Sequence, residues 1–400
     1  LTGWSASASP GVNLEIAQDT GYAGAAMRLD FDFHGSAGFV IARKAFALTL
    51  PANYAFTFKM RAQAPPNVLE FKLVDPKGES VWWSKRPDFV FPEEWQQITV
   101  RKSRFELAWG SKGSDLPKRI GYIELAISAG MGGKGSVWID DLRLEEREAD
   151  ERVDLKPKVT ASTFIDGHEP RLVLDQNPQT SWRSGSLADE QWLLIDFQRR
   201  REYGGLVIDW DPDDYATTYR VQISDDGASW TRAYSSTTGN GSRGYIYMPD
   251  AESRYVRLEL VQSSRGQGYE VRGLAVKPVA FSSSPNQFFV EIAADALPGI
   301  YPKYLYGRQT YWTVIGVNGD EKEALINEEG MLEVEKRGFS IVPFLYADGA
   351  LLTWNDVQTS QGLEQGYLPM PSVTWQRDPL ALQVPAFASG PPGASTLTAS

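Results

Sequence analysis

The sequence contains no cysteine and only two histidines. Without cysteine there is no disulfide, no thiolate nucleophile and no sulfur-ligated metal. The histidines, His34 and His168, have no partner at the spacing of a metal site or a catalytic triad. Glycine-rich phosphate-binding loops are also absent. No catalytic constellation is therefore visible, and thiol chemistry is excluded.

The chain also has fewer basic than acidic residues. The chain has 40 Lys and Arg against 51 Asp and Glu, a formal charge of -11 and a pI near 4.9. Phosphate recognition needs a concentrated positive field, so nucleic acid and anionic membranes are not expected partners. No run is long and apolar enough to suggest a transmembrane segment. The chain begins at Leu1 without a charged and then apolar leader, so we expect a removed signal peptide or a cut piece of a longer chain.

Aromatic residues are plentiful by comparison. They make up 12% of the chain, with 13 Trp and 17 Tyr, against 23% charged residues. This balance suits β-sandwiches whose cores and binding faces both use rings. A chain of 400 residues fits two or three domains of about 100 to 200 residues each.

Short alternating runs of apolar and polar residues fill the middle of the chain, and each predicts a half-buried strand. They lie at 192–197, 219–224, 254–258 and 269–271, after a polar turn at 174–182. An Asp-Asp-Gly sequence at 225–227 predicts a tight hairpin that folds Trp230 back under Val221 and Ile223. The segment is thus expected to be an antiparallel sandwich.

These blocks, in this order, resemble the discoidin or coagulation-factor 5/8 C-type domain over residues 159–278. The resemblance implies a galactose-binding-like sandwich, which in bacteria commonly serves as a family-32-type carbohydrate-binding module. Its loop residues His168, Arg183 and Tyr269 are candidate carbohydrate contacts. The alternative is that each is an ordinary surface residue.

Residues 1–148 are predicted to form a first jelly roll, followed by a charged linker at 149–158. Strand-like runs lie at 25–31, 54–61, 68–73, 95–100, 120–126 and 136–144. The unit resembles the sugar-binding jelly rolls of the family-11 and CIA30-like kind found beside bacterial glycosidases. The resemblance rests on residues 21–29, 75–83, 91–95 and 137–142.

Residues 279–400 look similar to the β-sandwich that precedes the helical-barrel domain of some large bacterial glycosidases. Their tail stops where another strand could begin, so we expect the sheet to be left incomplete. The predicted fold is therefore all-β, with two galactose-binding-like jelly-roll sandwiches and a third, incomplete sandwich segment. The pair Glu328-Glu329, before Gly330, is expected to be a solvated acidic turn rather than a catalytic pair.

A structural calcium ion is expected in the middle domain. A tight turn can combine carboxylate, carbonyl and hydroxyl oxygens, which are the ligands calcium prefers. The discoidin resemblance implies that Asp175, Asn177 and Thr180 contribute these oxygens and that Glu270 closes the site. The alternative is an Asx turn beside an unrelated Glu. In the first unit, the resemblance to calcium-clamped modules makes Glu15 and Asp141 further candidates.

Alternation also sorts the faces of the first unit. Tyr54, Phe56, Phe58 and Met60 are predicted to point one way with Leu69, Phe71 and Leu73, leaving Lys59, Arg61, Glu70 and Lys72 on the opposite side. By the same count Tyr122 and Glu124 oppose Ile123 and Leu125. Rings can stack on the apolar face of a pyranose while charged groups take its hydroxyls. Carbohydrate-binding candidates are therefore Trp82, Trp83, Trp109, Arg61, Lys72 and Tyr122.

The alternative is a simply solvated face, with the Trp82 and Trp83 pair divided between core and rim. Overall we expect non-catalytic binding of a polysaccharide or oligosaccharide, in the N-terminal region of a secreted or periplasmic glycan-active protein. Two alternatives remain open at this point. One is a glycoside hydrolase whose active site lies in the third segment or outside this sequence, and the other is a protein-binding adhesion module.

Overall fold

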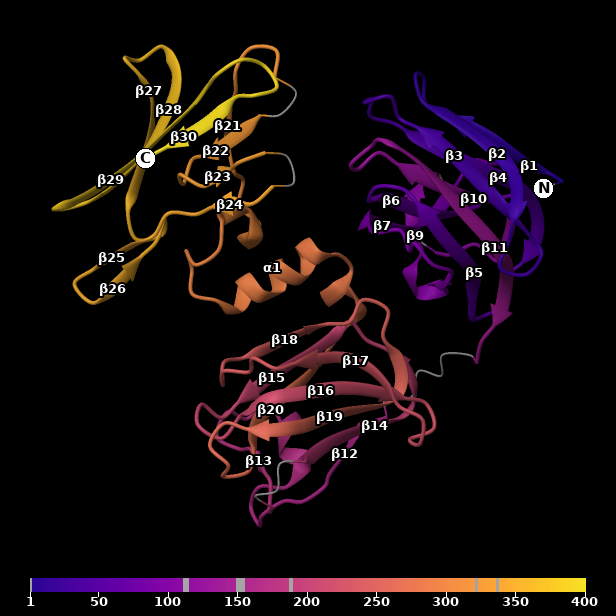
Figure 1. Cartoon of the computed structure of the whole chain (residues 1–400). Helices are drawn as coiled ribbons and strands as arrows, with labels where there is room; N and C mark the ends of the chain where they lie inside the picture. The colour runs from indigo at the N-terminus through magenta and orange to yellow at the C-terminus, as the bar shows by residue number, and fades with distance from the viewer. Residues whose placement is uncertain (1, 111–114, 149–154, 187–189, 321–322, 336–337) are drawn as a thin grey trace. The chain divides into compact units, whose positions relative to one another are not determined.

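The computed structural model describes residues 2–110, 115–148, 155–186, 190–320, 323–335 and 338–400. The chain forms two compact units, Leu1–Lys156 and Pro157–Ser400 (Figure 1). The predicted linker, 149–158, falls largely on residues 149–154, which lie outside the described residues. The all-β prediction is confirmed, since α1 (Pro285–Asp295) is the one α-helix in the described part of the chain.

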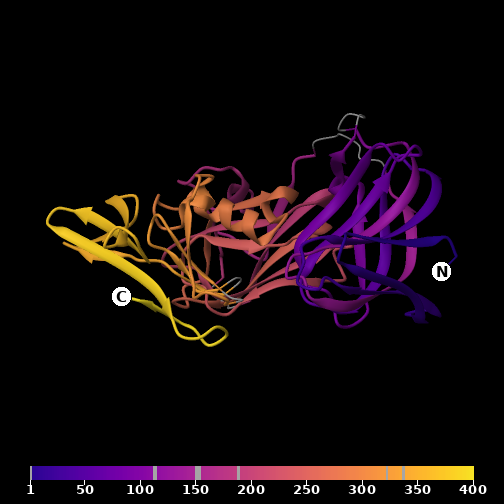
Figure 2. The same cartoon turned by 90° about the horizontal axis from the view of Figure 1, so that it is seen from above.

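The first unit is a sandwich of two antiparallel sheets (Figure 2). Sheet A has the order β1 (Trp4–Ala8), β4 (Phe39–Thr49), β10 (Arg119–Ser128), β6 (Asn67–Val74), β7 (Val81–Phe89) and β9 (Glu106–Trp109). Sheet B has the order β2 (Asn13–Thr20), β3 (Ala25–Asp32), β11 (Lys134–Glu146), β5 (Tyr54–Gln63) and β8 (Gln96–Arg101). A single 3-10 turn, η1 (Lys102–Arg104), follows β8.

The core of this unit lies between the two sheets, as alternation predicts. Phe56, Phe58 and Met60 of β5 are buried there together with Phe71 and Leu73 of β6. However, β5 belongs to sheet B and β6 to sheet A. Their outward residues therefore lie on opposite outer faces of the sandwich, and the single polar face predicted from the two strands is wrong.

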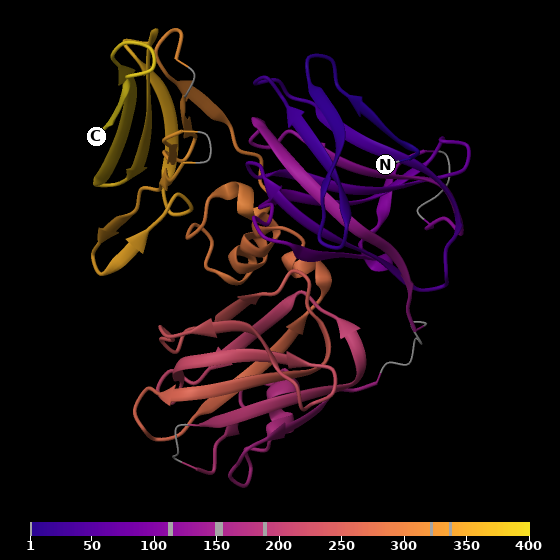
Figure 3. The same ribbon diagram turned by 45° about the vertical axis from the view of Figure 1, so that its right-hand side comes forward.

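Residues 157–278 form a second sandwich (Figure 3). Sheet C has the order β12 (Lys158–Ala161), β14 (Gln191–Glu202), β19 (Glu252–Ser263), β16 (Ala216–Ser224) and β17 (Thr231–Ser236). Sheet D has the order β13 (Trp182–Arg183), β20 (Glu270–Lys277), β15 (Gly205–Trp210) and β18 (Gly244–Tyr247), and η2 (Pro170–Leu174) precedes β13. A separate apolar core, with Trp182 and Tyr203 fully buried, holds these sheets together.

Trp230 does not occupy its predicted place. Residues 225–230 join β16 to β17, so the connection is longer than a tight hairpin. The guanidinium carbon of Arg257 lies 4.1 Å from the Trp230 ring centroid, and Arg257 also donates to the side chain of Gln222 at 2.8 Å. Val221 faces the core while Gln222 faces outward. Trp230 therefore lies on the outer face, and its predicted burial beneath β16 is wrong.

The third segment begins with η3 (Val279–Ser282) and α1 and continues mainly as short strands after η4 (Lys303–Tyr306). One sheet contains β21 (Trp312–Ile315), β22 (Ala324–Asn327), β23 (Leu332–Glu333) and β24 (Ser340–Ile341). A hairpin of β25 (Leu345–Ala347) and β26 (Ala350–Leu352) precedes a second sheet, which contains β27 (Gln358–Glu364), β28 (Leu368–Arg377), β29 (Leu380–Ser389) and β30 (Thr396–Ala399). Its core is small and centres on Trp354 and Trp375.

Helix α1 was not expected. Ser284 caps it by accepting the backbone N–H of Gln287 at 3.1 Å, and Pro285 occupies its first turn, which are two ordinary helix-start signals. Its Phe288 packs edge-on against Tyr247 of β18, with ring centroids 5.2 Å apart. The helix thus covers part of the second sandwich. With 11 residues α1 is too short to cross a bilayer. Within the described ranges, no helix is both long enough and apolar enough to span a membrane.

Candidate functional site

A row of outward side chains crosses five strands of sheet A. The strand registers pair Arg43 of β4 with Glu124 of β10, Glu124 with Lys72 of β6, Lys72 with Trp83 of β7, and Trp83 with Glu106 of β9. Residues directly opposite each other in an antiparallel sheet share a face. We call these five residues, together with Trp109 of β9 on the same face, the sheet-A row.

The charges along this row are paired and largely covered. Lys72 Nζ lies 2.8 Å from Glu70 Oε2, and their side chains are only 6% and 4% exposed. The hydroxyl of Ser128 donates to Glu70 at 3.0 Å, and Arg43 Nε lies 3.4 Å from a Glu124 oxygen. Burying a charge is costly unless a partner compensates it. The Lys72–Glu70 pair is therefore fixed and covered, so this part of the face is not simply solvated, whereas Arg43 is half-buried and Glu106 is exposed. The other part of the solvated-face alternative is confirmed, because Trp82 lies in the core and Trp83 on the outer face.

Aromatic rings cover the pair formed by Lys72 and Glu70. Trp83 and Trp109 meet edge to face with centroids 5.9 Å apart, and Lys72 Nζ lies 5.8 and 5.5 Å from their centroids. Trp83 Nε1 donates to Glu106 at 3.1 Å, which fixes its orientation. Trp109 remains 50% exposed. Two indoles are thus held in place at the surface, where an apolar ligand face could stack on them.

The structure brings Trp83, Trp109 and Tyr122 to one face, and the Tyr122 ring centroid lies 4.1 Å from the Arg43 guanidinium carbon. Lys72 lies on the same face, but its side chain is only 6% exposed beneath the two indoles, so its assignment as a direct carbohydrate contact is wrong. Arg43 itself was missed. The residues next to Arg43 in the sequence do not mark it as part of this face. Its neighbour on the face is Glu124 of β10, which is far away along the chain.

Trp82 is wrong as a carbohydrate contact, and the grouping of Arg61 with Lys72 on one face is wrong. Trp82 is 0% exposed and lies in the core, because successive strand residues point to opposite faces and Trp83 points outward. A fully buried ring cannot stack on a ligand. Arg61 lies on β5, so it belongs to the outer face of sheet B and cannot join Lys72 in one site.

In the second domain, Tyr269 is 0% exposed and part of the core, so its assignment as a carbohydrate contact is wrong. Its backbone N–H donates to the Ser184 hydroxyl at 3.0 Å, which anchors it beside β13. His168 Nδ1 lies 2.8 Å from the Ser181 hydroxyl oxygen. Arg183 lies 3.2 Å from Asp214, so both candidates already take part in internal polar contacts.

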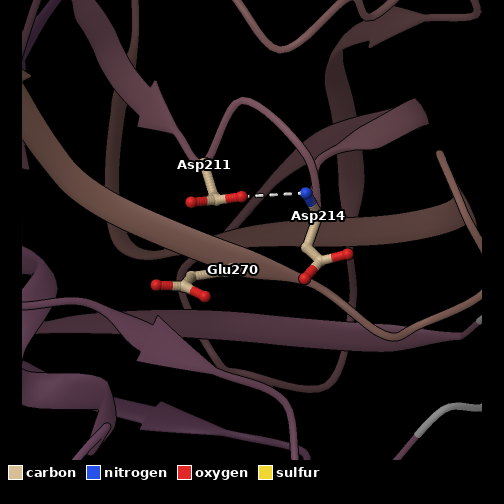
Figure 4. Close-up of side chains that lie close together, drawn as sticks. All are labelled: Asp211, Asp214 and Glu270. Atoms are coloured by element: carbon tan, nitrogen blue, oxygen red, sulfur yellow. Dashed lines mark hydrogen bonds between the residues drawn. The ribbon is translucent and has the colours of Figure 1, made fainter.

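Three carboxylates meet beside β20. Oxygens of Asp211, Asp214 and Glu270 lie within 4.8 Å of one another (Figure 4). Three guanidinium groups compensate them: Arg183 contacts Asp214 and Glu270, Arg265 contacts Asp214 at 2.9 Å, and Arg272 contacts Asp211 at 2.7 Å.

Hydrogen bonds also stabilise the charged form of Asp211. Burial raises the pKa of this carboxyl, but the backbone N–H groups of Asp214 and Asp213 and the Arg272 guanidinium outweigh burial and hold its pKa below the ordinary value. The group is thus an internal ion network that ties the 211–214 loop to β20.

The predicted calcium turn presents hard oxygen atoms close together. The Thr180 hydroxyl lies 2.8 Å from Asp175 Oδ2 and 2.9 Å from the Asn177 carbonyl oxygen. Ser181, the next residue, donates to Glu270 Oε1 at 2.7 Å, so Glu270 borders the turn. The carboxylate, carbonyl and hydroxyl oxygens fit the ligand preference of calcium. Arg183 Nη1 lies 3.6 Å from the other oxygen of Glu270 and reduces its free charge.

The second predicted calcium pair is wrong. Glu15 pairs with Asp30, which pairs with Ser136 on β11. Asp141 follows Ser136 by five residues on the same strand, a distance of about 16 Å. The two carboxylates cannot share one ion. Asp141 instead accepts from Arg143 Nε at 2.7 Å.

The predicted solvated turn at Glu328 and Glu329 is also wrong. Glu329 is only 1% exposed, and its carboxylate accepts the backbone N–H of Lys303 at 3.2 Å. Burial raises its pKa. Asn327 causes this geometry, since its side-chain oxygen accepts the N–H groups of Glu329 and Met331 and tightens the turn. Glu329 thus connects the β22–β23 turn to η4.

Comparison with known proteins identifies the second domain. Residues 158–272 match the family model of the F5/8 type C domain, which confirms the family expected there. The rat "Discoidin, CUB and LCCL domain-containing protein 2" is 26% identical over 130 residues, covering 26% of this chain and 17% of the relative. The chain therefore spans about a sixth of that curated relative.

Several solved structures are also similar. Chitosan-binding module 2 of a chitosanase/glucanase from Paenibacillus sp. IK-5, in complex with chitotriose, is 29% identical, covering 31% of this chain and 98% of that one, with a TM-score of 0.29. A family 11 carbohydrate-binding module from Clostridium thermocellum is 14% identical, covering 36% and 89%, with a TM-score of 0.31. The family 32 module of NanJ from C. perfringens, in complex with galactose, is 14% identical, covering 30% and 92%, with a TM-score of 0.28.

Proposed function

We propose that this protein binds an oligosaccharide on the outer face of sheet A. The observation that carries the proposal is the sheet-A row, in which paired charges and two fixed indoles share one face. The row crosses four strand spacings, or about 19 Å. This length exceeds a single monosaccharide and favours a chain of several units lying across the strands.

Each part of the row has a chemical task in such a complex. The exposed Trp109 and the neighbouring Trp83 offer ring faces for the C–H surface of a pyranose. At the other end of the row, Arg43 offers guanidinium donors for hydroxyl groups, and the nearly buried Glu124 holds it in place. Because the charges are already paired, little reorganisation is needed when the ligand binds.

The same pairing favours a neutral ligand on this face. Lys72 is paired with Glu70 and Arg43 lies beside Glu124. The exposed Lys85, 4.9 Å from the Trp83 centroid, and the exposed Glu106 carry opposite charges, so the face as a whole has no net charge.

The second domain adds a structural role for calcium in the proposal. The oxygens of Asp175, Asn177 and Thr180, with Glu270 beside them, would hold the ion and brace the 175–180 turn. Calcium would stabilise the loop and not contact carbohydrate. The F5/8 type C match supports a second binding module in tandem, which would raise avidity for a polymer. Such a region suits a secreted or periplasmic glycan-active protein.

A glycan array on the full chain, followed by calorimetric titration of the best neutral oligosaccharide, tests this proposal. Trp83→Ala and Trp109→Ala should each weaken binding by about 1–3 kcal/mol without unfolding the first unit, which its melting transition checks. Trp230→Ala is the matched control, because that indole lies on the outer face of the second domain under Arg257. Both row variants binding as tightly as the original chain, while folded, would contradict the proposed site.

A further inference from the structure

A second cluster of rings and cations lies on the outer face of sheet B, and the proposed function does not use it. We call it the sheet-B cluster, and its members are Tyr22, Lys59, Arg61, Trp95 and Trp138. Trp138 of β11 pairs in register with Arg61 of β5. On the other side of β5 lies β8, and Trp95 immediately precedes that strand. Because β5 belongs to sheet B, this face is separated from the sheet-A row by the whole core.

Arg61 is held between two indoles. Its guanidinium carbon lies 4.7 Å from the Trp138 centroid and 5.3 Å from the Trp95 centroid. Its Nε is buried without a hydrogen-bond partner, and among the described residues no carboxylate lies within ion-pair distance of its guanidinium. The two Nη atoms are not buried and make no hydrogen bond to the described residues, so they are free to bind a ligand.

Arg28 lies on the other side of Trp138 on the same face, and carboxylates compensate its guanidinium charge. It contacts Asp19 and Asp30, each at 2.8 Å. Trp138 Nε1 donates to Asp19 at 3.0 Å, so the acidic groups are engaged toward β2 and β3. The uncompensated cation therefore lies toward β8, away from these carboxylates.

Lys59 and Tyr22 complete the cluster. Lys59 Nζ lies 4.7 Å from the centroid of Tyr22, which is 55% exposed and meets Trp95 edge-on at 6.2 Å. The Tyr22 loop is held in place by Asp140, whose Oδ2 accepts the backbone N–H of Ala23 at 2.9 Å. An exposed ring is thus positioned beside Lys59 and, across Trp95, on the same face as Arg61, and neither cation has an ion pair within the described ranges.

We propose that the sheet-B cluster is a second saccharide-binding site, specific for sugars that carry a carboxylate, such as the uronate units of an acidic polysaccharide. A planar guanidinium with two free Nη atoms matches a carboxylate in a bidentate pair. Lys59 adds a second positive charge, and Tyr22 offers a ring face to the pyranose. The sheet-A row differs because its cations are paired with carboxylates.

The test titrates the full chain with a galacturonate trimer and, as the matched neutral probe, the same trimer fully methyl-esterified. We expect the acidic trimer to bind at least 10-fold more tightly. Arg61→Gln should remove this preference, and Arg61→Lys should retain part of it. Arg257→Gln, which removes another guanidinium stacked on an indole, is the control and should bind like the original chain.

A crossed experiment, in which each variant is tested with the ligand of the other site, distinguishes the two sites. Trp83→Ala should leave binding of the acidic trimer unchanged, whereas Arg61→Gln should leave binding of the neutral oligosaccharide unchanged. If Arg61→Gln lowers the melting temperature, Tyr22→Ala replaces it, because that ring is exposed and part of a loop. Equal affinity for both trimers, no binding of the acidic trimer, or unaltered binding by the folded variants would overturn the proposal and leave the sheet-A site untouched.

Discussion

Lys72 and Glu70, two residues apart on β6, form a 2.8 Å ion pair that is almost entirely covered although it lies on the outer face of a sheet. Trp83 and Trp109 cover it, and the hydroxyl of Ser128 completes the hydrogen bonding of Glu70. A buried pair contributes little to stability compared with an apolar replacement, but losing one partner is costly. We interpret the pair as a fixed base for the two indoles.

Removing one member of this pair should therefore cost more than removing both. Lys72→Met and Glu70→Gln should each destabilise the first unit by about 3 kcal/mol, because the remaining partner is left uncompensated. The double variant should recover at least half of that loss. Differential scanning calorimetry of the first-unit transition measures both values, and purely additive losses would show that the pair is not coupled.

Calcium removal should lower the melting temperature of the second domain. A ligand that binds only the folded state stabilises it by about 2.7 kcal/mol at a concentration 100 times its Kd. Asp175→Ala should abolish the response to chelator. The control is Asp226→Ala, another turn aspartate, which should destabilise the domain but leave the calcium response intact. Identical thermograms with calcium and with chelator would rule out the ion.

Acid should weaken the first unit partly through Asp19. Hydrogen bonds from the Trp138 side chain, the Thr20 backbone and Arg28 lower its pKa from 3.8 to about 2. A lowered carboxyl pKa stabilises the fold above pH 3.8, and this contribution is lost as the pH falls toward 2. Asp19→Asn should flatten the dependence of the melting temperature on pH in this window. An unchanged slope would show that Asp19 does not contribute.

Helix α1 should behave as part of the second domain. Phe288 packs against Tyr247 and Phe281, each with centroids 5.2 Å apart, whereas the adjacent Phe289 is 47% exposed. Phe288→Ser should therefore destabilise the second domain by about 2 kcal/mol. Phe289→Ser is the matched control and should have little effect. If both variants lose the same free energy of unfolding in urea, the packing of Phe288 on the second domain does not stabilise that domain.

Local sequence patterns were sufficient for the fold class and for much of the core. The alternation in β5 and β6 correctly assigned Phe56, Phe58 and Phe71 to the interior. The order of blocks in the second domain was enough to identify the F5/8 type C family. Both depend on short-range order, because the period of two in a strand is a property of the strand itself.

The tertiary structure decided which outward residues meet. Alternation separates inward from outward residues but does not say which sheet a strand joins, so Arg61 and Lys72 were assigned to one face although β5 and β6 lie in different sheets. The sheet-A row depends on pairings such as Arg43 with Glu124, which are 81 residues apart along the chain. Burial of Glu329 likewise depends on η4, which local sequence does not place. Long-range pairing, set by the closure of two sheets around one core, therefore determines the candidate binding faces of this protein.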